Sequence, residues 1–215
     1  MEKKLISLFV WFTLAAVALA APIDDFSTGG SLAPAPGVDM AELTAARAAY
    51  AKGRLEECEA QLKMAKSKSP GLPPVDLMLC RLHFSHKRTA AGKALLEKVA
   101  AEHTEHPEVY LLSGNVALSE SRLTDAYVHF EKALGVGGTV KIGAPDSWSQ
   151  EQKDALLREG LSGLTTISER RKDWFKAQLA LKELVKLSPG DAKVRDRLGA
   201  ALFMLGREDE ALEQF

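Results

Sequence analysis

The chain has 215 residues, of which 46% are hydrophobic and 27% charged, a composition typical of globular proteins rather than of collagen-like or fully disordered chains. Its 28 basic and 29 acidic residues give a net charge of -1, so it lacks the overall positive field that general nucleic-acid binding requires, and we expect no nucleic-acid partner. Two isolated cysteines are too few for a disulfide-based scaffold and do not form a zinc-ligand pair. A buried core must therefore stabilise the fold.

The N-terminal segment predicts export. Two lysines precede an apolar run over residues 5–19, which ends in the pattern Ala-Leu-Ala that signal peptidase accepts. We expect residues 1–20 to be a cleaved signal peptide, and the mature protein to be periplasmic or extracellular, with no stable membrane insertion. The alternative is an uncleaved N-terminal helix that anchors the chain, because the run approaches the roughly 20 residues that span a bilayer. Proline and glycine interrupt residues 21–38, which predicts a flexible leader.

From Asp39 onward the sequence repeats with a period of 34 residues. The units cover 39–72, 73–106 and 107–140 and, after an insert over 141–157, continue over 158–191 and 192–215. Small residues occupy two fixed places of every unit. The eighth place holds Ala46, Cys80, Gly114, Thr165 and Gly199, and the twentieth holds Cys58, Gly92, Ala126, Ala177 and Ala211. Small side chains let two helices approach closely, and large apolar residues dominate the seventh and twenty-fourth places beside them.

Apolar residues within each unit follow helical spacing, with a break near the middle such as Lys52-Gly53-Arg54. Each unit is therefore predicted to be a helix, a turn and a second helix. Proline and glycine end the second helix in Ser69-Pro70-Gly71 and Ser188-Pro189-Gly190. The last unit is incomplete, so we expect the chain to be a fragment of a longer array, or else to bind something through its open end.

This spacing resembles the tetratricopeptide repeat family. The residues that carry the resemblance are Pro107, Tyr110, Gly114, Ala126, Phe130 and Ala133 in the third unit, and Leu198, Gly199, Gly206, Ala211 and Phe215 in the fifth. The first unit departs from the pattern, with two alanines where leucine and glycine are usual. The resemblance implies an all-α fold, a right-handed α-solenoid of stacked antiparallel helix pairs over residues 39–215.

The insert predicts an extension of the following helix. Ser147 or Ser149 is placed to cap it, and Gln150 or Gln152 would complete a capping box. Trp148 would then either overhang the edge of the groove or pack the insert onto the third unit.

The family resemblance also implies a concave face, formed by the first helices at places two, five, nine, twelve and thirteen. Nine residues of the first three units are expected to form its peptide-binding part. These are Leu43, Arg47, Tyr50, Leu77, Arg81, Phe84, Leu111, Asn115 and Leu118. Arginine pairs with carboxylates and apolar walls exclude water, so the expected partner is a protein or peptide with apolar and acidic residues. The alternative is that some of these leucines pack between helices instead.

Farther along the chain the same face is expected to turn polar. The corresponding places hold Glu159, Ser162, Thr166, Glu169, Arg170, Lys193, Asp196, Ala200, Phe203 and Met204. The lysines and asparagines with which some family members grip an acidic C-terminus are mostly replaced by leucine here, so that role is not supported. Residues 39–119 are thus the predicted binding face.

Catalytic and metal sites are not predicted. His83 and His86, and likewise His103 and His106, are three residues apart, but no cysteine or carboxylate completes a metal-ligand set. The chain also lacks a phosphate-binding loop and a nucleophile elbow. We therefore expect no enzyme activity, no metal and no cofactor.

Two questions stay open at the level of sequence. Cys58 and Cys80 fall on neighbouring helices, so either a disulfide or two buried thiols would fit an exported chain. The function is expected to be that of an exported scaffold that binds a peptide segment. The alternative is an accessory repeat region of a larger envelope protein, an enzyme or assembly factor, whose activity lies outside this chain.

Overall fold

The structure, a computed structural model, describes residues 41–135 and 148–215, and within these ranges every regular element is an α-helix. The predicted signal peptide, the leader and the first part of the insert lie outside the described residues. The helices are α1 (Ala41–Ala51), α2 (Leu55–Lys68), α3 (Val75–Ser85), α4 (Thr89–Glu102), α5 (Pro107–Ser119), α6 (Leu123–Leu134), α7 (Gln150–Arg170), α8 (Trp174–Leu187), α9 (Ala192–Met204) and α10 (Glu208–Leu212).

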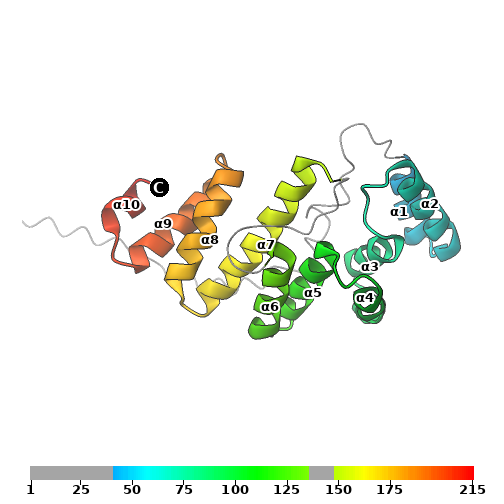
Figure 1. The fold of residues 1–215 in the computed structure, drawn as a ribbon, viewed down its shortest axis with the longest axis horizontal. Helices are drawn as coiled ribbons and strands as arrows, with labels where there is room; N and C mark the ends of the chain where they lie inside the picture. Colours follow the sequence, from blue (N-terminus) through cyan, green and yellow to red (C-terminus); the bar gives the residue numbers. More distant parts are fainter. Residues whose placement is uncertain (1–40, 136–147) are drawn as a thin grey trace, which may run out of the picture.

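The helices form five consecutive pairs, α1 with α2 through α9 with α10. The second helix of each pair also packs against the first helix of the next, and α5 contacts α7 directly. Figure 1 shows the pairs following one another along the long axis, with α1 and α2 at one end and α10 at the other. The predicted all-α fold of stacked helix pairs is confirmed.

The turn inside each pair has the same backbone geometry in all five units. The fifteenth place has a positive φ in every unit, between 58° and 74°, at Gly53, Lys87, Ser121, Lys172 and Gly206. Its N–H donates to the carbonyl of the twelfth place, and the next N–H donates to the carbonyl of the eleventh, as in Gly53 to Tyr50 (2.9 Å) and Arg54 to Ala49 (3.0 Å). These two bonds form a Schellman motif, which satisfies the last carbonyls of the first helix and reverses the chain.

Small residues lie where the helices cross. All ten residues at the eighth and twentieth places are buried, as predicted from their size. A Cβ atom added to Gly114 would lie 2.8 Å from the ring of Phe130, and one added to Gly163 would lie 2.4 Å from the same ring. Phe130 of α6 thus packs against the backbone of both α5 and α7, because the glycines at these two contacts have no side chain.

The insert continues into the long helix α7. Ser149 accepts a hydrogen bond from the Gln152 N–H, and the Gln152 side chain accepts one from the Ser149 N–H. This confirms the predicted capping box and the predicted extension of the helix, which has 21 residues. Trp148, just before the cap, is only 5% exposed and packs with the core of the third to fifth units.

Candidate protein-interaction surface

Most residues expected to line the N-terminal part of the concave face are buried. Leu43, Tyr50, Leu77, Phe84 and Leu111 are each no more than 2% exposed. They belong to the cores between neighbouring helices, so a peptide could not reach their side chains without opening the fold. Leu118 is half-buried and packs against the core of the later units.

The two arginines predicted to pair with a ligand differ in environment. Arg81 is 2% exposed, and its Nη2 lies 3.4 Å from Oε2 of Glu108, which is 1% exposed. Arg47, in contrast, is exposed at the surface of α1. Of the two guanidinium groups, therefore, Arg81 joins α3 to α5 and Arg47 faces solvent.

A contact between equivalent places of successive units explains why Arg81 is buried and Arg47 is exposed. The ninth place of one unit reaches the second place of the next, so that Arg81 meets Glu108 and Asn115 donates to Oε1 of Glu159 at 2.6 Å. The second place of the second unit is Pro74, which offers Arg47 no carboxylate. This signal was readable in the sequence once the period was known.

A further polar contact joins α7 to α9. Arg197 donates through Nε and Nη2 to the two carboxylate oxygens of Glu169, at 3.0 and 2.9 Å. The same Nη2 lies 3.4 Å from the Thr166 hydroxyl. A bidentate pair of this kind fixes the relative position of two helices.

Among the residues expected to line the concave face, large apolar side chains are exposed in the fifth unit, not in the first three. Phe203 is 57% exposed and Met204 54% exposed, at the twelfth and thirteenth places. Ala200, Lys193 and Asp196 around them are also exposed. The expectation of a polar surface there is thus incomplete. Sequence reasoning identified Phe203 and Met204 but missed their importance, since the twelfth place is buried in the first two units and the thirteenth holds no large apolar residue before Met204.

The first of the two histidine pairs, His83 and His86, lies around Tyr50. The Tyr50 hydroxyl and His83 Nδ1 are 2.7 Å apart, the His86 ring lies 4.6 Å from the Tyr50 ring, and the Arg88 guanidinium lies 5.1 Å above it. Burial raises the pKa of Tyr50, and burial together with Arg88 lowers the pKa of His83. Nowhere in the described ranges do three or more histidine, cysteine or acidic side chains gather as metal ligands would.

His106, from the second pair, lies between three parts of the chain. Its ring packs edge-on against Trp148, with the centroids 5.8 Å apart. One turn farther on, Gln152 Nε2 lies 3.4 Å from the Gly71 carbonyl in the linker between α2 and α3. Burial, and then the positive charges of His103, Lys66 and Arg81, lower the pKa of His106 to about 4.

The two cysteines are both buried free thiols in the structure. Cys80 donates to the Gly92 carbonyl at 3.1 Å, and burial raises its pKa to about 12. Burial also raises the pKa of Cys58. Thiols with raised pKa values react slowly, because the thiolate is the reactive form. The alternative disulfide stays a prediction that thiol counting can test.

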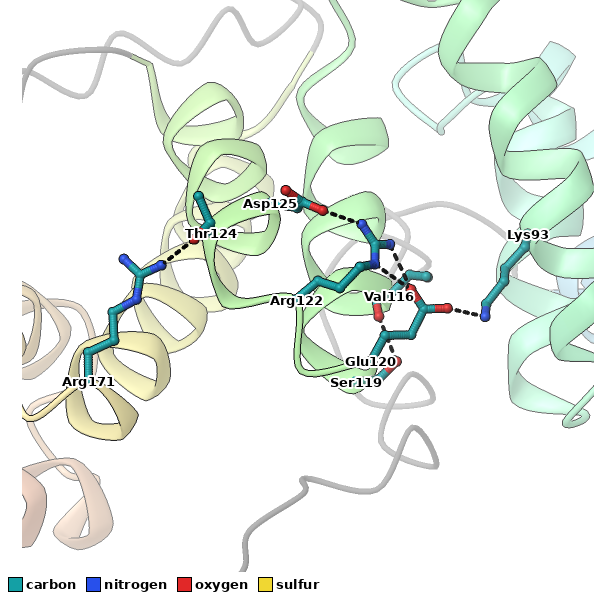
Figure 2. Close-up of polar contacts among 8 residues, drawn as sticks. All are labelled: Lys93, Val116, Ser119, Glu120, Arg122, Thr124, Asp125 and Arg171. Atoms are coloured by element: carbon teal, nitrogen blue, oxygen red, sulfur yellow. Dashed lines mark hydrogen bonds and ion pairs between the residues drawn. The ribbon is translucent and has the colours of Figure 1, made fainter.

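A network of exposed polar side chains follows the turn edge of the third and fourth units (Figure 2). Glu120 contacts Lys93 of the preceding unit and Arg122 of its own, and Arg122 in turn contacts Asp125 at 2.6 Å. Arg171 donates to Thr124 at 2.9 Å. Exposed ion pairs of this kind add little stability individually and leave a charged, solvated edge.

Known proteins resemble this chain in structure but not detectably in sequence. No protein-family model and no curated protein matches it. Among solved structures, the MamA protein superposes with a TM-score of 0.55 and 16% identity, covering 82% of this chain and 87% of its own. A structure of MamA from AMB-1 gives a TM-score of 0.53 at 16% identity, covering 82% and 89%. A thermophilic TPR protein of Thermus thermophilus, TTC0263, gives 0.48 at 17% identity, covering 81% and 87%.

These likenesses concern the fold. Together with the five helix pairs, the shared turn geometry and the buried small residues, the superposition on the two MamA structures shows a helical solenoid of stacked pairs, as the repeat spacing predicted. Within the described ranges, no helix combines the length and the apolar character needed to cross a membrane.

Proposed function

We propose that this protein is a non-catalytic scaffold that is exported and binds segments of partner proteins through its concave face. The export part of the proposal rests on the lysine-led apolar run at the N-terminus. The binding part rests on one observation above all: Phe203 and Met204, at places that the repeat resemblance assigns to the concave face, are more than half exposed. Large apolar side chains that are exposed together offer a partner an apolar contact area.

The chemistry around Phe203 and Met204 suits a peptide with an apolar anchor and an acidic group. A methionine and an aromatic ring supply a deformable apolar contact. Arg170 and Lys193, at concave places of the fourth and fifth units, are exposed and carry positive charge. The partner class expected from the sequence is retained, but its main contact moves from residues 39–119 toward the fifth unit.

Arg47 extends the proposal to the other end of the face. Its guanidinium is exposed and can pair with a ligand carboxylate, whereas Arg81 is held by Glu108. Asn115 and Leu118 are half-buried and supply at most secondary contacts. Replacing Arg81 therefore tests folding, and replacing Arg47 tests binding.

The experiment begins with selection of linear peptides from a random phage-displayed library. Affinities of selected peptides are then measured by fluorescence polarisation for wild type, for Phe203→Ser with Met204→Ser, and for Arg47→Glu. We expect the double variant to weaken binding at least tenfold, since each lost apolar contact is worth about 1–2 kcal/mol. Arg47→Glu should weaken the acidic peptides by about 1–3 kcal/mol.

Met64→Ser is the matched control, because Met64 is 48% exposed on the outer helix α2. It should leave peptide affinity unchanged, and thermal unfolding should show that all variants are folded. Failure to select any peptide, or equal affinity in wild type and the Phe203/Met204 variant, would refute the proposal.

A further inference from the structure

Helix α8 presents an unusual outer surface. Phe175 is 60% exposed and Leu179 is 50% exposed, and they are four residues apart. Lys182 and Lys186 follow at spacings of three and four and are exposed too. These four side chains share one face of the helix, because residues three and four apart are neighbours on a helix surface.

Positive charge surrounds this face. Arg171 and Lys172 lie in the turn before α8, and Lys176 lies on its first turn, all three exposed. Only Glu183 among the exposed residues of α8 is acidic. Asp173 caps the helix by accepting a hydrogen bond from the Lys176 N–H at 3.1 Å, and its carboxylate lies 3.7 Å from Lys176 Nζ. Glu183 pairs with Lys186 at 2.7 Å, and Glu131 of α6 hydrogen-bonds the nearby Tyr127. The surface therefore combines two large apolar side chains with a clear excess of cations.

The neighbouring helix α6 adds to the same surface. Arg171 and Lys176 lie over the ring of Tyr127, at 5.8 and 5.3 Å from its centroid. Arg171 also donates to Thr124, as Figure 2 shows. Val128, next to Tyr127, is 45% exposed. These contacts hold the cations beside the apolar side chains, and we call the surface of Val128, Arg171, Lys172, Phe175, Lys176, Leu179, Lys182 and Lys186 the α8 face.

The outer helices of the first two units differ. On α4 no large apolar side chain is exposed among the described residues. On α2, Leu55 and Met64 are exposed but nine residues apart, which places them on opposite sides of the helix. Helix α2 carries three glutamates and three lysines, so its charges balance, whereas α8 carries three lysines and one glutamate.

We propose that the α8 face is a peripheral docking site for an anionic lipid bilayer. Lysines and an arginine attract the protein to negatively charged headgroups, and a phenylalanine and a leucine then enter the boundary between headgroups and acyl chains. The rest of α8 packs in the core through Ala177, Leu181 and Leu184, so the helix docks with the fold intact. This inference is independent of the proposed peptide binding, which uses the first helices.

The test is co-sedimentation with vesicles, using residues 21–215 so that the apolar run at the N-terminus takes no part. Vesicles of phosphatidylcholine with phosphatidylglycerol are compared with vesicles of phosphatidylcholine alone, at low and high salt. We expect binding only to the anionic vesicles, weakened at least tenfold by high salt. Phe175→Ser with Leu179→Ser, and separately Lys172→Glu with Lys182→Glu, should each reduce it at least tenfold.

Met64→Ser with Lys63→Glu on α2 is the control, as it changes the same kinds of residue at similar exposure and should bind like wild type. Thermal unfolding confirms that each variant is folded. Absent vesicle binding, or binding that all variants retain, overturns the proposal. Self-association that Phe175→Ser with Leu179→Ser abolishes, without vesicle binding, overturns it as well and assigns the face to a second copy.

Discussion

At the scale of single residues, the fifteenth place carries a conformational cost in three of the five units. Lys87, Ser121 and Lys172 adopt positive φ values of 58–60°, in the region that side chains with a Cβ disfavour. Gly53 and Gly206 occupy the same place in the first and fifth units without that cost. The array thus contains both forms of one turn, which allows a direct comparison.

Lys87→Gly should stabilise the protein by about 1 kcal/mol, and Gly53→Ala should destabilise it by a similar amount. The measurement is denaturant unfolding followed by circular dichroism. Gly190→Ala is the control, since Gly190 has no positive φ and a Cβ added there meets nothing within 4 Å. Its stability should stay near wild type. A Lys87→Gly variant less stable than wild type would contradict this account of the turn.

The sequence predicted where the turns lie but not which residues of the first helices are exposed. The break triplets such as Lys52-Gly53-Arg54 placed the turns correctly, because polar and glycine residues interrupt the helical apolar spacing there. The exposure of concave residues could not be predicted in that way. Whether Tyr50 or Phe203 faces solvent depends on neighbouring units, and both occupy the twelfth place.

At the scale of helices, close contact depends on glycine at particular crossings. Gly163 of α7 and Gly114 of α5 both contact the ring of Phe130, and at neither position is there room for a Cβ atom in place of the glycine hydrogen. Gly163→Ala should therefore destabilise the protein by about 1–3 kcal/mol, the usual cost of overpacking a rigid core. Gly92→Ala should cost less, since its Cβ would lie 3.0 Å from Phe84 compared with 2.4 Å from Phe130.

A double-mutant cycle isolates the contact. Phe130→Leu removes the ring, so that Gly163→Ala should cost clearly less in that background than in wild type. Unfolding free energies of the four proteins give the coupling directly. Additive effects of the two substitutions would mean that Phe130 is not the group that Gly163 accommodates.

At the scale of the whole molecule, some contacts join segments that are far apart in the sequence and belong to units that are not consecutive. Gln152 on α7 reaches Gly71, 81 residues earlier, and Trp148 packs against His106 between them. The capping box that starts α7 was predictable, because it is a local signal. The contact with Gly71 was not, since no local pattern records how far a solenoid curves.

His106 makes this junction sensitive to pH. Its pKa is lowered from 6.5 to about 4 in the folded state by burial and by the nearby cations. In the unfolded chain the imidazole takes up a proton below about pH 6.5, whereas in the folded protein it stays neutral down to about pH 4. The unfolded state thus binds more protons between these values, and the free energy of unfolding must fall as the pH falls through that window. The contribution of His106 to the fall is at most about 3 kcal/mol.

The measurement is the unfolding free energy between pH 7 and pH 4 for wild type, His106→Asn and His86→Asn. Asparagine cannot take up a proton, so His106→Asn should lose a large part of the wild-type pH dependence. His86 is exposed, and its replacement is the matched control for exchanging an imidazole for an amide. His83 and His129, whose pKa values burial also lowers, remain in both variants and contribute to the residual slope, as do Glu42 and Glu120, whose pKa values their basic partners lower. If His106→Asn kept the full pH dependence of the unfolding free energy, His106 would have to be reached by solvent in the folded protein, contrary to its packing against Trp148. The pH dependence would then arise from other titrating groups.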